Sequence, residues 1–287
     1  MNLLDELQKR VLIADGATGS QLQKAGLPTG YPPELWNVEQ PGLIYRHYMS
    51  YLDAGSDIIL TNTFGGSPIK LAAEKLSHRT AELNLAAARL ARKAAGNDHF
   101  VLGDVGPTGK ILSPLGDLSA EDTVSSFQAQ IQALVDGGVD AILIETMSAL
   151  EEAQAAVKAA RLVTDVPVIV TFSFDTHGRT MMGLKPEKAL NDLWDGTIQG
   201  IGANCGRTLD ETLTAIQSMK KAQSGVLLMA KPNAGMPSLE HARSVYDVSP
   251  ETMADYAGKF LQEGVRIFGG CCGTTPDHIK AVKKAIG

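Results

Sequence analysis

The strongest constraint on the fold is an alternation that recurs along the chain. A short apolar run is followed by a loop rich in glycine or polar residues, and most loops lead into a stretch rich in alanine, glutamate and lysine. Apolar runs of this length are typical of strands buried on both faces, as in a parallel sheet. There are eight such runs, at residues 11–14, 57–60, 100–103, 141–144, 168–171, 198–202, 226–229 and 265–268.

The stretches between the runs have the composition and the punctuation of helices, with clear examples at 70–95, 120–137, 149–163 and 276–286. The last begins after Thr275 with a proline and an aspartate, which suit an N-cap and a first helical turn. Eight such units predict an α/β fold, a (β/α)8 TIM barrel, and because no linker divides the chain we expect one domain over 1–287. An open doubly wound sheet is the alternative, disfavoured because no GxGxxG follows the first run.

Charge and composition exclude several classes of partner. The chain has 26 Lys and Arg against 32 Asp and Glu, a net charge of −6, which offers no electrostatic footprint for nucleic acid or an anionic membrane. No run approaches the ~20 apolar residues of a membrane span. Charged residues also interrupt the start of the chain, where a signal peptide needs an apolar core. We therefore expect a cytoplasmic protein with no nucleic-acid or membrane partner.

All three cysteines of the chain follow predicted strands: Cys205 the sixth, and Cys271 and Cys272 the eighth. Alternate strands of a barrel direct side chains into the same layer, so these thiols can converge. Cys205 as a small buried apolar residue, a vicinal disulfide at 271–272 and a phosphate site at the surrounding glycines are the alternatives. Because all three fall at strand ends, we favour a zinc site with an open fourth position.

Three thiolates leave zinc with a net charge near −1, which makes it a poor activator of water. Such a site suits a substrate thiol, which binds in the open position and loses its proton. A free thiol is mostly protonated at pH 7 and therefore a weak nucleophile without such help. The predicted reaction is alkylation of a thiol, with sulfur attacking an activated carbon.

Two carboxylates, Asp15 and Glu145, follow the first and fourth predicted strands on the same rim. Together they suit the ammonium group of an amino acid, and the amides of Gly16, Ala17 and Thr18 suit its carboxylate. A loop-capping role is the alternative for Asp15. An unpaired acid at the end of a very apolar run is costly, so a functional role is favoured for Glu145.

Six motifs along the chain resemble the zinc-dependent homocysteine S-methyltransferase family: DGATGSQL (15–22), TNTFGGS (61–67), GDVGPTG (103–109), GANCG (202–206), PNAG (232–235) and GGCCGTTP (269–276). The resemblance implies a (β/α)8 barrel that methylates homocysteine to give methionine. It implies zinc on Cys205, Cys271 and Cys272, and the homocysteine amino group on Asp15 and Glu145. It also implies that Asn233 approaches the metal when homocysteine is absent.

The methyl donor is the open question within this family. TNTFGGS, DVGPTG and PNAG resemble most the homocysteine module of cobalamin-dependent methionine synthase, so we expect a methylcorrinoid on a separate protein. A small onium donor, betaine or S-methylmethionine, is the alternative and would need an aromatic cage. Trp36 matches an aromatic position of the betaine enzymes, and we expect Trp36 and Asn62 on the donor side. Gly65 and Thr146 stand where animal betaine enzymes carry tyrosines. A barrel that senses zinc or redox state without turnover is the alternative of another class.

Overall fold

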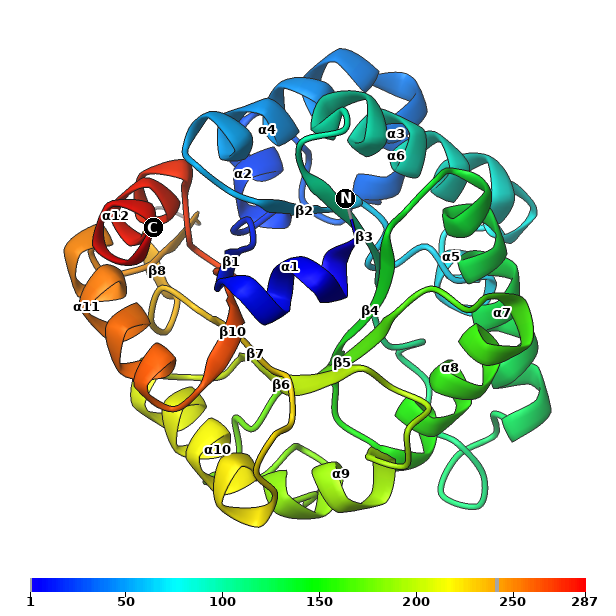
Figure 1. Ribbon diagram of the computed structural model, residues 1–287. Coiled ribbons are helices and arrows are strands. Elements are labelled where there is room, and N and C mark those ends of the chain that lie inside the picture. The colour runs from blue at the N-terminus through cyan, green and yellow to red at the C-terminus, as the bar shows by residue number, and fades with distance from the viewer. Residues whose placement is uncertain (1, 241–242) are drawn as a thin grey trace.

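The structure, a computed structural model, describes residues 2–240 and 243–287 and contains a barrel of eight parallel strands (Figure 1). The strands lie in the order β1-β10-β7-β6-β5-β4-β3-β2. A parallel bridge from Ala14 to Ile58, with the Asp57 amide donating to the Ile13 carbonyl over 2.7 Å, joins the first and last strands. The predicted (β/α)8 barrel is confirmed. The strands are β1 (Leu12–Ile13), β2 (Ile58–Leu60), β3 (Phe100–Val105), β4 (Ala141–Met147), β5 (Val168–Phe172), β6 (Gly200–Cys205), β7 (Leu228–Pro232) and β10 (Val265–Phe268).

Strands β6 and β7 begin two residues later and end three residues later than their predicted runs. Strand β6 contains glycines because its backbone lies very close to the neighbouring strand. A Cβ at Gly202 would lie only 1.8 Å from the carbonyl oxygen of Met229 on that strand. The pairing with β7 continues to Cys205, which lies opposite Pro232 and is the last residue of β6. The thiol is therefore held by the sheet rather than by a loop.

Helices surround the barrel, and most of the predicted ones are present. The exception is the predicted helix at 70–95, where the first helical segment ends at Ala72 and Lys75 then adopts a φ of +58°. The alanine-rich composition conceals this left-handed turn, so the prediction of one continuous helix is wrong. The helices are α1 (Leu3–Lys9), α2 (Gly19–Lys24), α3 (Trp36–Glu39), α4 (Pro41–Asp53), α5 (Pro68–Ala72), α6 (Thr80–Ala95), α7 (Ala120–Asp136), α8 (Leu150–Val163), α9 (Pro186–Leu193), α10 (Leu209–Ala222), α11 (Pro250–Gln262) and α12 (Pro276–Ile286), with 3-10 turns η1 (Pro33–Leu35) and η2 (Ser77–Arg79).

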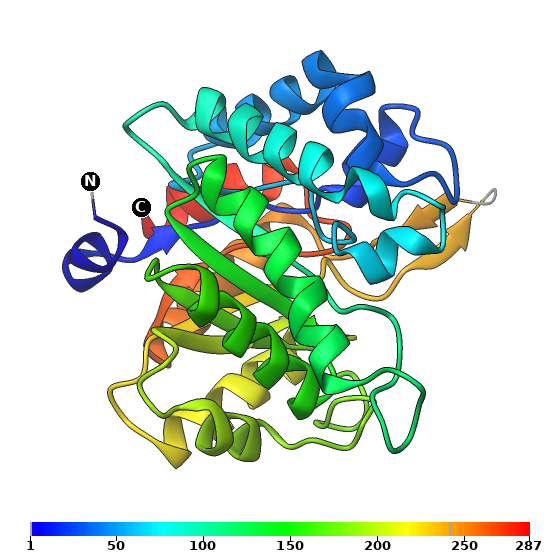
Figure 2. The ribbon, with the colours of Figure 1, turned by 90° about the vertical axis from the view of Figure 1, so that its right-hand side faces the viewer.

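Helix α1 lies across the N-terminal end of the barrel (Figures 1 and 2). Leu3 and Leu7 are each 3% exposed and pack with the apolar side chains of the barrel interior. The Asn2 side chain caps the helix by accepting a hydrogen bond from the Leu4 amide over 2.9 Å. Because this end is plugged, a ligand reaches the interior from the C-terminal ends of the strands, where active sites of such barrels lie.

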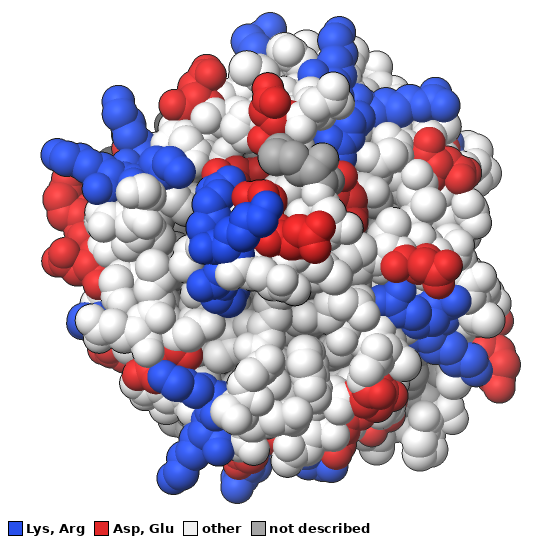
Figure 3. All heavy atoms as spheres, in the orientation of Figure 1, with Lys and Arg blue, Asp and Glu red and all other residues white. Residues whose placement is uncertain are grey.

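At the opposite end from α1, an antiparallel hairpin of β8 (Ser238–Glu240) and β9 (Arg243–Val245) projects from the loop after β7 (Figure 2). The sequence did not predict this hairpin. On the face that carries α1, acidic and basic side chains are interspersed (Figure 3), in keeping with the small net charge. No helix in the described part of the chain is long and apolar enough to cross a membrane.

Candidate active site

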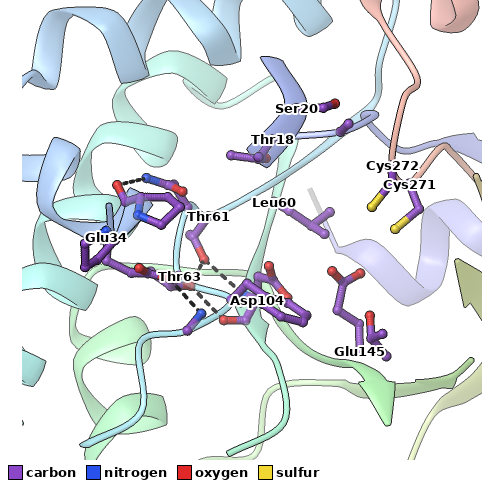
Figure 4. A pocket seen from close by; sticks show the side chains of 18 of the residues that line it. Thr18, Ser20, Glu34, Leu60, Thr61, Thr63, Asp104, Glu145, Cys271 and Cys272 are labelled. Carbon is purple, nitrogen blue, oxygen red and sulfur yellow. Dashed lines mark hydrogen bonds between the residues drawn. The ribbon is translucent and has the colours of Figure 1, made fainter. Parts of the chain in front are cut away.

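A cavity of about 640 Å³ opens at the C-terminal ends of the strands (Figure 4). Asp15, Trp36 and Asn233, three of the predicted residues, do not line the cavity. The other predicted residues that line it come from five of the eight strand ends and include every cysteine: Gly16, Ala17, Thr18, Asn62, Glu145, Cys205, Cys271 and Cys272.

The three cysteines converge as the sequence predicts. Their sulfur atoms all lie within 4.8 Å of one another, and the sulfurs of Cys205 and Cys271 are 2.8 Å apart. Cys271 and Cys272 present their sulfurs on the side of the cavity nearest Glu145 (Figure 4). Three soft donors in one cluster could hold a metal ion and would leave a tetrahedral ion one open position.

The ionisation of the three thiols also fits a bound cation. Hydrogen bonds from the Cys205 and Cys271 thiols lower the pKa of Cys272 to about 3. The hydrogen bonds to Cys271 and Cys272 raise the pKa of Cys205 well above its ordinary value. One thiolate is thus solvated by two thiols, and a divalent cation in the cluster would allow all three to ionise.

Backbone hydrogen bonds from the segment after β7 hold both cysteine segments. The Asn233 amide donates to the Cys205 carbonyl over 3.2 Å, and the Ala234 amide donates to the Cys272 carbonyl over 2.9 Å. Cys205 itself has a φ of +56°, which is unfavourable for a side chain with a Cβ. Strain of this kind concentrates at functional sites, where the surrounding structure sustains it.

The Asn233 side chain lies against the Cys205 loop. Its Nδ2 donates to the carbonyl of Gly206 over 2.7 Å, whereas its buried Oδ1 has no hydrogen-bond partner among the described residues. The side chain is thus anchored next to Cys205 and keeps one buried acceptor without a partner in the described part of the chain. The role predicted for Asn233 near a metal stays a prediction.

Asn204 adjoins the sulfur cluster, and the sequence predicted no role for it. Its Nδ2 lies 3.7 Å from the sulfur of Cys205 and 3.9 Å from that of Cys271. Its Oδ1 accepts hydrogen bonds from the Thr171 hydroxyl over 2.8 Å and from the Thr146 amide over 2.9 Å. The same Nδ2 donates to the Thr146 hydroxyl over 2.6 Å, so one N–H group is used there and the other faces the sulfurs, where it favours the thiolate forms. Its place directly before Cys205 was the available clue.

A buried charged cluster lies beside the cysteines. Asp15 is fully buried, and its Oδ2 accepts a hydrogen bond from the Leu60 amide over 2.8 Å. Lys231 is 3% exposed, with its Nζ 3.4 Å from Asp15 Oδ1 and 3.9 Å from Glu145 Oε2. Asp104 is the third buried acid, and its Oδ1 has no hydrogen-bond partner among the described residues. The sequence predicted Asp15 and Glu145 here but missed Lys231 and Asp104.

Burial dominates the acid–base properties of this cluster. Burial raises the pKa of Asp15 and Asp104, and it raises that of Glu145 to about 7, while Lys231 partly opposes each shift. Burial disfavours the charged form of Lys231, but Glu145 and Asp15 outweigh it and raise its pKa. Three carboxyl groups facing one ammonium leave a deficit of positive charge, which a substrate ammonium can fill in place of bound protons.

The loop after β1 forms another wall of the cavity. The Ala17 amide donates to the Thr274 hydroxyl over 3.0 Å, so it is already engaged. The amides of Gly16 and Thr18 have no hydrogen-bond partner among the described residues. Two of the three predicted amide donors are therefore free to meet a carboxylate.

The cavity wall away from the cysteines carries an acid (Figure 4), and two aromatic rings also line the cavity. Glu34 is 5% exposed and accepts a hydrogen bond from the Gly65 amide over 2.7 Å, and the rings are those of Tyr31 and Phe64. The Asn62 side chain lines the cavity and donates to the Pro33 carbonyl over 2.8 Å. The sequence did not predict a role for Glu34.

Trp36 is 8% exposed and belongs to the hydrophobic core between the barrel and its helices rather than to the cavity wall. A donor-side role for Trp36 stays a prediction.

Comparison with solved structures agrees with this geometry. The homocysteine methyltransferase MmuM from Escherichia coli, in its metallated form, is 26% identical with a TM-score of 0.82, over 98% of this chain and 99% of that chain. Its oxidised form is 26% identical with a TM-score of 0.80, over 98% and 97%. A putative dihydrodipicolinate synthetase from Pseudomonas aeruginosa, 12% identical with a TM-score of 0.52 over 94% and 73%, shares the fold alone.

The family model described as homocysteine S-methyltransferase matches residues 12–286, which run from the first strand to the last helix. The match therefore spans the cysteine cluster, the buried acids and the loop after β1. These residues lie together at the mouth of one barrel, as an enzyme of this kind requires. The chain belongs to the homocysteine S-methyltransferase family.

Proposed function

We propose that this enzyme is a zinc-dependent homocysteine S-methyltransferase, with zinc held by Cys205, Cys271 and Cys272. The observation that supports the proposal is the convergence of these sulfurs within 4.8 Å at one end of a cavity that also contains Glu145. When bound, zinc supplies a Lewis-acid site at which a thiol loses its proton near neutral pH.

The protein's own residues would orient the amino acid beside that site. Asp15 and Glu145 would together receive the homocysteine ammonium group, Glu145 from the cavity wall and Asp15 from the buried cluster beside Lys231, and the free amides of Gly16 and Thr18 would receive its carboxylate. The side chain of the substrate then extends toward the cysteines, with its sulfur facing the open cavity. The side of the sulfur that faces away from the cysteines is then accessible to a methyl donor. The sulfur, the methyl carbon and the leaving group of the donor can therefore lie in one line, as a displacement at carbon requires.

We propose a methylcorrinoid on a separate protein as the donor, which would approach over the cavity mouth. Support comes from the motifs TNTFGGS, DVGPTG and PNAG, which resemble those of the methionine synthase module. They lie at the ends of β2, β3 and β7 and in the loops that follow, on the face where the cavity opens. Exposed apolar side chains on loops after the strands also suit a protein partner: Phe64, Ile111, Leu115, Met181, Met182 and Met236. We further propose that residues 1–287 act as one catalytic domain, in a cytoplasm that keeps its thiols reduced.

A small onium donor, betaine or S-methylmethionine, is the second candidate. The observation that favours it is the pair of buried acids, Glu34 and Asp104, in the cavity with Tyr31 and Phe64. Carboxylates and aromatic faces both attract a desolvated cation. Here the donor would enter the cavity itself rather than remain above its mouth.

A parallel assay tests these proposals. Zinc-loaded protein and homocysteine are incubated separately with methylcobalamin, a methylated corrinoid protein, betaine, S-methylmethionine or S-adenosylmethionine, and methionine is measured by mass spectrometry. We expect methionine with the corrinoid donors. Methionine formed with betaine or S-methylmethionine, and not with either corrinoid donor, would contradict the corrinoid proposal and support the onium donor.

The matched control is the Cys272→Ser variant, which we expect to lose both bound zinc and methionine formation. Full activity in a zinc-free variant would overturn the mechanism. The non-catalytic sensor is tested by titration with homocysteine, because thiol binding at an open zinc site releases about one proton. A protein that releases no proton and forms no methionine with any donor would support the sensor.

A further inference from the structure

Thr274 connects the cysteine cluster to the loop after β1. It lies two residues after Cys272 and is fully buried. Its hydroxyl donates to the carbonyl of Cys271 over 2.7 Å and accepts a hydrogen bond from the amide of Ala17 over 3.0 Å. A single hydroxyl group therefore joins the backbone of a predicted metal ligand to the backbone of the predicted carboxylate-binding loop.

Tyr51, on helix α4, provides a second connection between the same two segments. Its buried hydroxyl lies 2.9 Å from the carbonyl of Ala17 and 3.2 Å from the carbonyl of Thr274, and it can donate to both. Both polar backbone groups of Ala17 are thus held, the amide by Thr274 and the carbonyl by Tyr51. The loop cannot move relative to the cysteines without breaking buried hydrogen bonds.

Two glycines show how closely the backbone packs around these hydroxyl groups. A Cβ at Gly16 would lie 2.6 Å from Thr274 Oγ1 and 2.7 Å from Tyr51 Oη. A Cβ at Gly270 would lie 2.4 Å from Thr274 Oγ1. Both positions exclude a side chain, so the backbone segments approach the Thr274 side chain from two directions. The arrangement is a packed connection rather than a chance contact.

We propose that Thr274 is a positioning residue that sets the span between the two ends of the bound amino acid and thereby selects homocysteine over cysteine. The proposal rests on the proposed function, in which the head group binds at residues 15–18 and the sulfur binds at the cysteines. Cysteine is shorter by one methylene, about 1.5 Å of reach. A fixed span cannot accommodate that difference, whereas a loose loop can move to meet the shorter substrate.

Paired substitutions at Thr274 test the role of its hydroxyl. Thr274→Val keeps the shape of the side chain but removes the hydroxyl, and Thr274→Ser keeps the hydroxyl. In zinc-loaded enzyme, the KM for homocysteine is compared with the inhibition constant of cysteine as a competing thiol. Discrimination by one methylene is typically about 10–200-fold, so there is a measurable ratio to lose.

We expect Thr274→Val to raise the KM for homocysteine about tenfold, because the head group is no longer held at the right distance from the sulfur. The inhibition constant of cysteine should not rise in parallel, so its ratio to the KM falls about tenfold. The Thr274→Ser variant should keep the ratio within about threefold of the wild type. A merely structural defect would weaken both thiols equally and leave the ratio unchanged.

A second readout needs neither zinc nor turnover. In zinc-free protein kept reduced, hydrogen exchange of residues 14–22 reports on the Ala17 amide, which loses its acceptor in Thr274→Val. We expect faster exchange there and unchanged exchange in helix α8 on the far side of the barrel. If Thr274→Val does not fold, Tyr51→Phe removes the other connection and should lower the same ratio.

An unchanged ratio in either hydroxyl-deleting variant that folds would overturn the proposal, as would failure of Thr274→Ser to restore it. Failure of the proposed function has a different signature: the wild-type protein itself would form no methionine from homocysteine. If the wild type forms methionine and discriminates against cysteine, and the variants do so equally well, the positioning role of Thr274 is refuted and the proposed function stands.

Discussion

Replacing Glu145 by glutamine should stabilise the substrate-free protein at alkaline pH while weakening homocysteine binding. The Glu145 side chain is buried, and its Oε2 has no hydrogen-bond partner among the described residues, although Lys231 Nζ lies 3.9 Å away. Burial raises the pKa of Glu145 from its ordinary 4.5 to about 7. The folded protein therefore holds this proton more tightly than the unfolded chain does.

The sign of the pH dependence follows from that difference. Because the folded-state pKa is the higher one, the free energy of unfolding falls as pH rises from about 4.5 to about 7 and stays low above it. At about 1.4 kcal/mol for each pH unit, the difference amounts to about 3 kcal/mol at pH 8. The Glu145→Gln variant keeps the shape of the side chain without this penalty, so it should be more stable than the wild type by about that amount.

Urea unfolding between pH 4.5 and pH 8, in zinc-free protein with reductant and chelator, measures the effect. The two proteins should have similar stability at pH 4.5 and diverge as pH rises. Glu121→Gln, on the exposed first turn of α7, is the matched control and should show no divergence. A variant that is less stable than the wild type at pH 8, or a difference independent of pH, would refute the reasoning.

In zinc-loaded enzyme the same Glu145→Gln variant should bind homocysteine about 10–100-fold more weakly, because a charged hydrogen bond is lost.

Two further substitutions test the metal cluster and the barrel. Asn204→Ala removes the amide beside the Cys205 and Cys271 sulfurs and should weaken zinc binding about 10–100-fold in a chelator competition, whereas Asn84→Ala, a buried asparagine outside the cavity, should not. Gly202→Ala places a Cβ against the β7 backbone and should cost about 3 kcal/mol in urea unfolding. Gly258→Ala, in helix α11 with open space around it, should instead stabilise by about 0.5–1 kcal/mol, and equal effects at the two glycines would contradict the packing argument.

The fold could be predicted because its strands are buried on both faces and therefore stand out as apolar runs. The run at 265–268 coincides with β10, and the stretch at 276–286 coincides with α12. The turn at Lys75 could not be predicted, because its left-handed conformation has no compositional mark. Helix α1 was also missed, because a seven-residue helix is defined by what it packs against, here the barrel interior.

Site residues could be predicted where their chemical type alone indicates a function. They could not be predicted where the function depends on a contact with a residue distant in the sequence. Three cysteines at strand ends are informative by themselves, and they converge in the structure. Lys231 is not informative by itself, because a lysine at a strand end is ordinarily solvated. Only the fold brings it to Asp15, which lies 216 residues earlier in the chain. The same holds for Thr274, whose hydroxyl acquires a role only where two loops meet.

An open position on the proposed zinc ion is the feature on which the proposed chemistry depends most directly. X-ray absorption spectroscopy of the zinc-loaded protein counts the sulfur ligands before and after homocysteine is added. We expect three sulfurs at about 2.3 Å and one lighter ligand in the free enzyme, and four sulfurs once homocysteine is bound. A spectrum with three sulfurs both before and after saturation with homocysteine would contradict thiol activation at this site.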